Sequence, residues 1–95
     1  MTHKILNSVC HVFAVTMSEL KGGRRHRNVA NARLCAAHLL TNGAKAGSAE
    51  VSAVMQKSRA WSYYAIKRCE DLVEVDRSFS RLCASAHHGA QEVAS

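Results

Sequence analysis

Apolar residues recur at intervals of three and four along almost the whole chain, and no proline interrupts them. Near the N-terminus they are Ile5, Leu6, Val9, Val12 and Phe13, the spacing that places side chains on one face of an amphipathic helix. Proline and glycine are the residues that most strongly interrupt helices, and this chain has no proline and only five glycines. We therefore predict an all-α fold.

Local capping signals divide this pattern into about six helices. In "TMSE", the side chains of Thr16 and Glu19 can each accept a hydrogen bond from the other's backbone amide, which forms a capping box. Asn28, Ser48 and Ser58 are residue types that cap the start of a helix. The predicted helices cover residues 3–13, 17–21, 29–41, 48–55, 58–73 and 76–88.

The chain has the size and composition of one domain. Its 95 residues are 47% hydrophobic, enough to bury one core without a metal or disulfide. We expect Gly89 to end the last helix, so that residues 1–89 form the domain and 90–95 a flexible tail. No apolar run is long enough for a membrane span, and polar residues interrupt the N-terminal segment, so we predict a cytoplasmic protein with no membrane partner.

The cysteine pattern favours free thiols and no metal or other cofactor. No two cysteines have the two-residue spacing of common zinc sites, and each lies in a predicted helix. The nearest approaches to a ligand pair are Cys35 with His38 and Cys83 with His87 or His88. Small apolar core cysteines beside solvent-facing histidines explain these pairs better than a metal site does.

The positive charge is concentrated in the first half of the chain. Residues 1–46 contain seven lysines and arginines and one acid, whereas residues 47–95 contain six of each, so the net charge of +6 belongs to the first half. The sequence "RRHRN", which begins at Arg24, follows two glycines and precedes an alanine-rich helix. This asymmetry, with a pI near 9.6, indicates a polyanionic partner, and nucleic acid is the commonest.

The helices predicted over 48–55 and 58–73 have the short-then-long proportions of a helix-turn-helix, although two helices of a simple bundle can look the same. Ser58 and the free amides of the first turn suit a phosphate oxygen. Arg59 and Ser62 are expected on one face, towards base edges. Trp61 has two interpretations, a DNA contact or a core residue, and of Tyr63 and Tyr64 we expect one to point inward and the other outward.

The stretch "ILNSVCHVFAVTMSELKGGRRHRNVANARLCAAHLL" resembles the C-terminal DNA-binding domain of the bacterial replication initiator DnaA. Residues 4–75 share its order of parts, but no phosphate-binding loop of an initiator ATPase is present. The resemblance implies a fold related to the Trp repressor helical family. It also implies that Arg25 inserts into the minor groove and that Arg33, early in the next helix, contacts DNA.

The chain departs from that family around both parts of the implied site. Ala32 and Leu34 replace the proline and glutamine that flank the family's arginine in the helix after the loop. In the recognition helix, Arg59, Ala60 and Trp61 replace base-reading Asp, His and Thr, and arginine donates where aspartate accepts. The family's target sequence is therefore not expected to be the target of this chain.

From these observations we predict that a helix-turn-helix and a basic loop bind double-stranded DNA sequence-specifically. The predicted role is that of a transcriptional or replication-linked regulator, with other regulatory or replication proteins as further candidate partners. The alternative is a protein- or RNA-binding adaptor that uses the same loop. No enzyme is predicted, because the chain lacks an organised nucleophile, base and orienting acid. The predicted DNA contacts are Lys21, Arg24, Arg25, Arg27, Arg33, Lys45, Lys57, Ser58, Arg59, Trp61 and Ser62.

Overall fold

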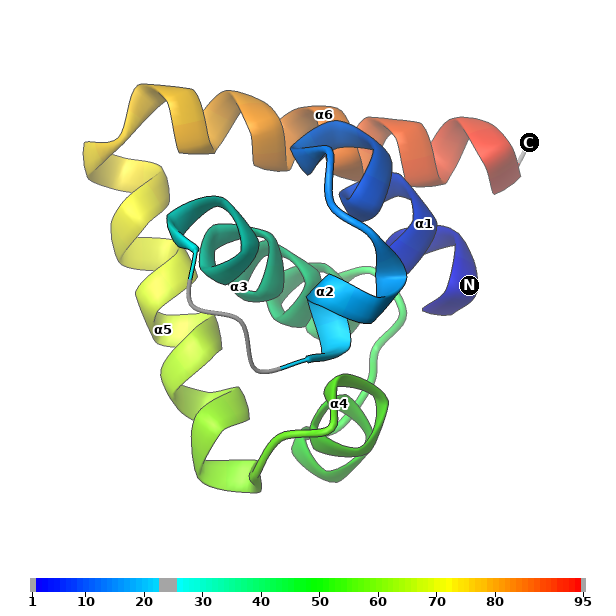
Figure 1. Cartoon of the computed structure of the whole chain (residues 1–95), viewed down its shortest axis with the longest axis vertical. Coiled ribbons are helices and arrows are strands. Elements are labelled where there is room, and N and C mark those ends of the chain that lie inside the picture. The colour runs from blue at the N-terminus through cyan, green and yellow to red at the C-terminus, as the bar shows by residue number, and fades with distance from the viewer. Residues whose placement is uncertain (1, 23–25, 95) are drawn as a thin grey trace.

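The computed structural model describes residues 2–22 and 26–94, with backbone only for 92–94. These residues form helices and no strand, which confirms the predicted all-α class (Figure 1). The helices are α1 (Thr2–Phe13), α2 (Met17–Lys21), α3 (Arg27–Asn42), α4 (Ser48–Met55), α5 (Arg59–Val75) and α6 (Arg77–Ala94).

Helix α3 is the centre of the fold and contacts all five other helices (Figure 1). Its apolar residues recur at intervals of three and four and are buried, namely Val29, Ala32, Ala36, Leu39 and Leu40. Helices α1 and α6 pack against each other on one side of α3, while α2 and α4 lie on the other. Among the described residues, α6 contacts neither α2 nor α4, so α6 lies apart from these two helices.

Two of the four predicted capping signals are confirmed, the box of Thr16 with Glu19 and the cap at Ser58. Ser48 does not cap α4, because it is the first residue of the helix and the N-cap position is Gly47, which has no side chain to accept a hydrogen bond. The capping box of α2 is present, since Glu19 N donates to Thr16 Oγ1 at 3.0 Å and Thr16 N donates to Glu19 Oε1 at 2.9 Å. Asn28 does not cap α3, because the helix begins one residue earlier and the Asn28 side chain donates to the carbonyl oxygen of Phe13. That bond ties the start of α3 to the end of α1, a tertiary contact that a local sequence signal cannot show.

The last helix does not end at Gly89 but continues to Ala94, so residues 90–94 belong to α6 rather than to the predicted tail. Gly89 serves helix packing instead. A Cβ atom at this position would lie 2.7 Å from Ser8 Oγ of α1, and that hydroxyl donates to the carbonyl oxygen of Ala86 at 2.6 Å. Glycine therefore lets α6 approach α1 closely enough for this bond between the two helices.

We predict that the effect of Gly89→Ala depends on residue 8. Alanine gains about 1 kcal/mol of helix propensity over glycine, but with Ser8 present its methyl group displaces a hydrogen-bonded hydroxyl, a loss of about 1 kcal/mol. The gain should therefore appear only in a Ser8→Ala background, as measured by urea unfolding of the four proteins of the cycle. Equal effects of Gly89→Ala in both backgrounds would contradict the packing argument.

No helix of the described ranges is both long and apolar enough to cross a membrane.

Candidate nucleic-acid interface

Helices α4 and α5 are joined by the three residues 56–58, as a helix-turn-helix requires. Gln56 adopts a left-handed conformation, with φ 57° and ψ 45°, and the Lys57 amide donates to the carbonyl oxygen of Ser52 at 2.9 Å. This geometry ends α4 and reverses the chain. Ser58 then caps α5, because its Oγ accepts a hydrogen bond from the Trp61 amide at 3.1 Å.

The N-terminal half of α5 exposes cationic and aromatic side chains and no acid. The exposed residues there are Arg59, Ala60, Tyr63, Tyr64, Lys67 and Arg68. Exposed acids begin at Glu70 and continue with Asp71 and Glu74 in the C-terminal half. The two ends of one helix therefore have opposite chemical character, and only the N-terminal end suits a polyanion.

Two expectations about the inner and outer faces of α5 were wrong. Ser62 is fully buried, and its hydroxyl donates to the carbonyl oxygens of Arg59 at 2.8 Å and Ser48 at 3.3 Å, so it cannot face base edges. Tyr63 and Tyr64 both point outward, with 61% and 57% of their surface exposed. Neighbouring helical residues are about 100° apart, so two of them fit side by side on one exposed face.

Tyr63 is a candidate contact that the sequence prediction missed. It lies four residues after Arg59, and its hydroxyl lies 3.1 Å from Ser48 Oγ, which also accepts a hydrogen bond from Arg59 Nη2 at 3.4 Å. The bond to Ser48, and next the positive charge of Arg59, lower the pKa of Tyr63. Residues three and four positions after Arg59 can both share its face of the helix, so the sequence spacing is compatible with Ser62 and with Tyr63.

Arg33 was predicted to contact DNA, but its side chain is directed into the protein. It is 8% exposed. Its Nε donates to the carbonyl oxygen of Leu20 at 2.9 Å, and its Nη2 donates to those of Glu19 at 2.8 Å and Gly22 at 2.6 Å. Burial lowers its pKa, although arginine keeps its charge throughout the physiological range. Arg33 therefore neutralises the C-terminal carbonyls of α2 rather than a phosphate.

Lys57 is also turned towards the end of α2, which differs from its predicted DNA contact. Its Nζ donates to the carbonyl oxygen of Gly22 at 2.9 Å, the same oxygen that Arg33 binds. Burial, and next repulsion by Arg33, lower the pKa of Lys57. Gly22 therefore accepts hydrogen bonds both from α3 and from the turn of the helix-turn-helix. It lies two residues before residues 24–27, which we call the basic segment.

The remaining predicted contacts have different positions. Arg24 and Arg25 lie outside the described residues. Arg27 is exposed at the start of α3, Lys45 is exposed in the connection between α3 and α4, and Ser58 is exposed at the start of α5. Trp61 is partly buried and packs against the hydrophobic core.

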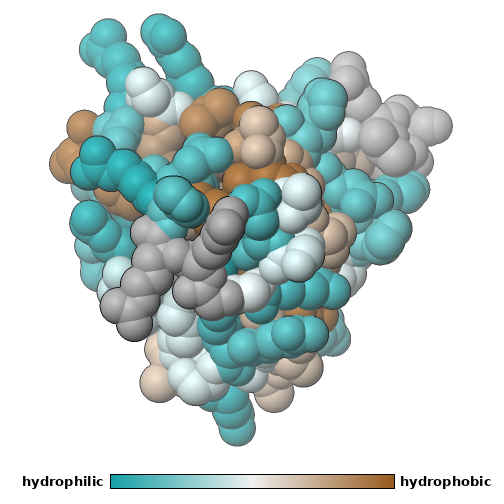
Figure 2. Space-filling view, viewed as in Figure 1, coloured by the Kyte–Doolittle hydropathy of each residue, from teal (hydrophilic) through white to brown (hydrophobic). Residues whose placement is uncertain are grey.

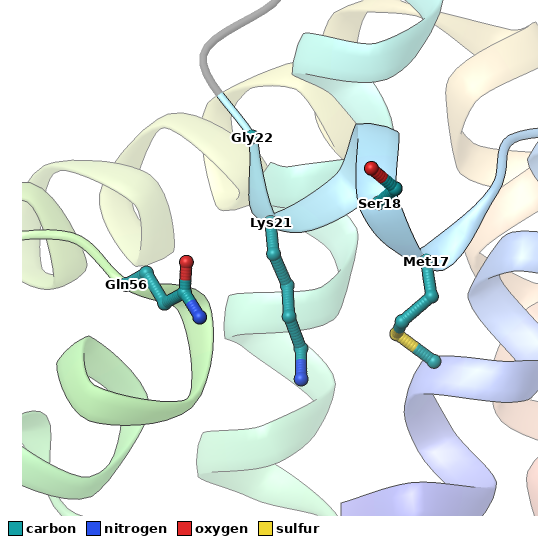
Figure 3. Close-up of a pocket in the computed structure, with 5 residues that line it drawn as sticks. All are labelled: Met17, Ser18, Lys21, Gly22 and Gln56. Carbon is teal, nitrogen blue, oxygen red and sulfur yellow. The ribbon is translucent and has the colours of Figure 1, made fainter.

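Lys21 lines a pocket of about 370 Å³ together with Met17, Ser18, Gly22 and Gln56 (Figure 3). The pocket lies between α2 and the turn that joins α4 to α5. Figure 3 shows the Lys21 side chain extending between those of Gln56 and Met17.

Three of the four cysteines belong to the core. Cys35, Cys69 and Cys83 are buried, on α3, α5 and α6. A hydrogen bond with Cys83, followed by burial, raises the pKa of Cys69, and a hydrogen bond with Cys35 raises the pKa of Cys83. Within the described part of the chain, no group of three His, Cys, Asp or Glu side chains is arranged to hold a metal ion.

We expect the native thiols to be poorly reactive, because the thiolate is the nucleophile and burial disfavours it. Only Cys10 is partly exposed, and burial raises its pKa too. Ellman's reagent at pH 8 should therefore modify at most one thiol per chain slowly, and four after denaturation in urea. Rapid modification of two or more thiols in the folded protein would contradict the buried cluster.

Comparison of the chain with protein-family models, curated protein sequences and solved structures finds no match.

Proposed function

We propose that this protein binds double-stranded DNA sequence-specifically, with the N-terminal half of α5 in the major groove and the basic segment in the adjacent minor groove. It would act as a transcriptional or replication-linked regulator associated with the nucleoid, alone or with other regulatory or replication proteins. The observation that carries the proposal is the polarity of α5, whose exposed residues 59–67 include two cations and two tyrosines and no acid, whereas its exposed residues 70–74 include three acids.

The turn before α5 supports this assignment. A recognition helix contacts base edges mainly through residues of its first turns, and the three-residue turn leaves that end of α5 exposed. Arg59 can donate two hydrogen bonds to a guanine edge, and Tyr63, one turn further, can contact a base, a sugar or a phosphate. The acids of the C-terminal half would be repelled by the DNA backbone, so only the first half of α5 is expected in the groove.

The position of the basic segment gives independent support. Lys57 and Arg33 both bind the Gly22 carbonyl oxygen, which lies two residues before the segment, and α3 begins at the segment's last residue, Arg27. Gly22 is therefore held beside the helix-turn-helix turn, and Arg27 begins a helix of the core. A narrow minor groove attracts arginine because its negative potential is enhanced. The resemblance to the DnaA C-terminal domain suggests the same arrangement, with the loop in the minor groove and the recognition helix in the major groove.

The decisive experiment is a competition assay. A labelled duplex from a random-sequence library is bound to the protein and then displaced by unlabelled duplex DNA, structured RNA or an acidic protein. Duplex DNA should compete far better than the other two, and repeated selection from the library should enrich one motif. We also expect little preference for the initiator family's target sequence, because the base-reading residues differ.

Other results of this assay lead to other functions. Better competition by RNA, or by the acidic protein, would replace the proposal with the adaptor function predicted as the alternative. Binding of duplex DNA without enrichment of any motif would leave a non-specific DNA-binding protein. In that case the exposed side chains of α5 would contact phosphates rather than bases.

A further inference from the structure

The pocket between α2 and the α4–α5 turn has two hydrogen-bond donors on neighbouring side chains. They are the Lys21 ammonium group and the Gln56 amide, and Met17, Ser18 and Gly22 complete the lining (Figure 3). No acid is among the described residues that line the pocket. Glu19, the acid of α2, directs one carboxylate oxygen to the Thr16 amide at 2.9 Å. A positive group beside a neutral donor, without an acid, suits an anion that carries several acceptor oxygens.

The position of the pocket in the fold indicates which anion it would bind. One lining residue, Gly22, lies two residues before the basic segment, and another, Gln56, lies three residues before Arg59. Figure 2 shows that the face on which α2 lies in Figure 1 is mostly hydrophilic. In the proposed complex the basic segment occupies the minor groove and α5 the adjacent major groove. A sugar-phosphate strand separates the two grooves of a duplex, so it must pass between these two elements.

We propose that this pocket binds one backbone phosphate of duplex DNA, with Lys21 as its charged contact and Gln56 as its neutral donor. The inference rests on the proposed function. The contact would fix the register of the protein on the strand between the two grooves, because phosphate contacts position a protein whereas base contacts specify a sequence. The neighbouring cations Arg33 and Lys57 hold the Gly22 wall of the pocket in place.

The first measurement is the salt dependence of binding to the selected duplex. Each neutralised phosphate contributes about 0.9 to the slope of log K against log salt concentration, so Lys21→Gln should lower the slope by about one. The same relation predicts roughly five- to tenfold weaker binding at about 0.1 M salt. Arg81→Gln is the matched control, because it removes one positive charge from the exposed surface of α6, which does not contact α2 or α4 within the described residues.

The second measurement locates the phosphate. A series of duplexes carries one neutral methylphosphonate each, at a different position. At one position the substitution should weaken binding of the wild type and of Arg81→Gln, but it should not further weaken binding of Lys21→Gln. Gln56→Gly keeps the left-handed backbone of the turn and removes the amide. It should weaken binding about two- to tenfold, the range for one neutral hydrogen bond, without changing the salt slope.

The results separate this inference from the proposed function. If the wild type selects a duplex but Lys21→Gln has the slope and the methylphosphonate profile of Arg81→Gln, the phosphate site is overturned and the proposed function stands. If the wild type does not bind duplex DNA, both are overturned. Circular dichroism and melting of each variant should match the wild type, since Lys21 is partly exposed, Gln56 is exposed, and glycine keeps the left-handed turn at position 56.

Discussion

Replacement of Arg33 by alanine is expected to lower the free energy of unfolding by about 2 to 4 kcal/mol. The side chain is almost wholly buried and donates to the carbonyl oxygens of Glu19, Leu20 and Gly22. Without it the carbonyl oxygens of Glu19 and Leu20 lose their charged donor, while that of Gly22 keeps Lys57, and a cavity opens between α2 and α3. For a domain of this size the melting temperature should fall by roughly 10 to 30 °C, which differential scanning calorimetry can measure.

Two variants serve as controls for Arg33→Ala. Arg27→Ala removes an exposed arginine from the first turn of the same helix and should change stability by no more than about 0.5 kcal/mol. Arg33→Lys retains the charge but not the planar fork that reaches several carbonyls, so its stability should lie between those of the wild type and Arg33→Ala. If Arg33→Ala melts like the wild type but binds DNA weakly, Arg33 is the DNA contact that the sequence predicted.

Arg59→Ala should raise the Kd for the preferred duplex about 5- to 150-fold and change the Kd for random duplex DNA far less. A bidentate contact between arginine and guanine discriminates by about 1 to 3 kcal/mol, which corresponds to this range. Arg59 is exposed at the first position of α5, and its contact with Ser48 Oγ, at 3.4 Å, is weak enough to be exchanged for a base. Fluorescence anisotropy with both duplexes measures the two constants.

Arg68→Ala is the matched control for this prediction. Arg68 lies nine residues after Arg59, about two and a half helical turns, and so on the opposite side of the same helix. Its removal should affect the two duplexes alike and only slightly. An equal loss of affinity for both duplexes in Arg59→Ala would make Arg59 a phosphate contact, and specificity would then depend on other residues such as Tyr63.

Much of the fold follows from interactions within one or two helical turns. The capping box of Thr16 and Glu19 and the cap at Ser58 involve residues three apart in the chain, so the sequence contains both partners. The three- and four-residue spacing of apolar residues in α3 is likewise a local pattern, and these residues are buried. For these reasons the number of helices and most of their limits could be predicted from the sequence.

The direction of the polar side chains depended on which helices pack together. A charged residue in a basic region predicts an exposed contact, but α2 lies across the start of α3 and offers Arg33 three carbonyl oxygens. Ser62 is buried because α4 packs over that side of α5, which leaves Tyr63 outward. α6 continues past Gly89 because a glycine that favours a helix end in isolation here permits close contact with Ser8. The sequence by itself determined the helices, whereas the tertiary structure decided which cations hold the protein together and which remain on its surface, since a partner distant in the chain leaves no local signal.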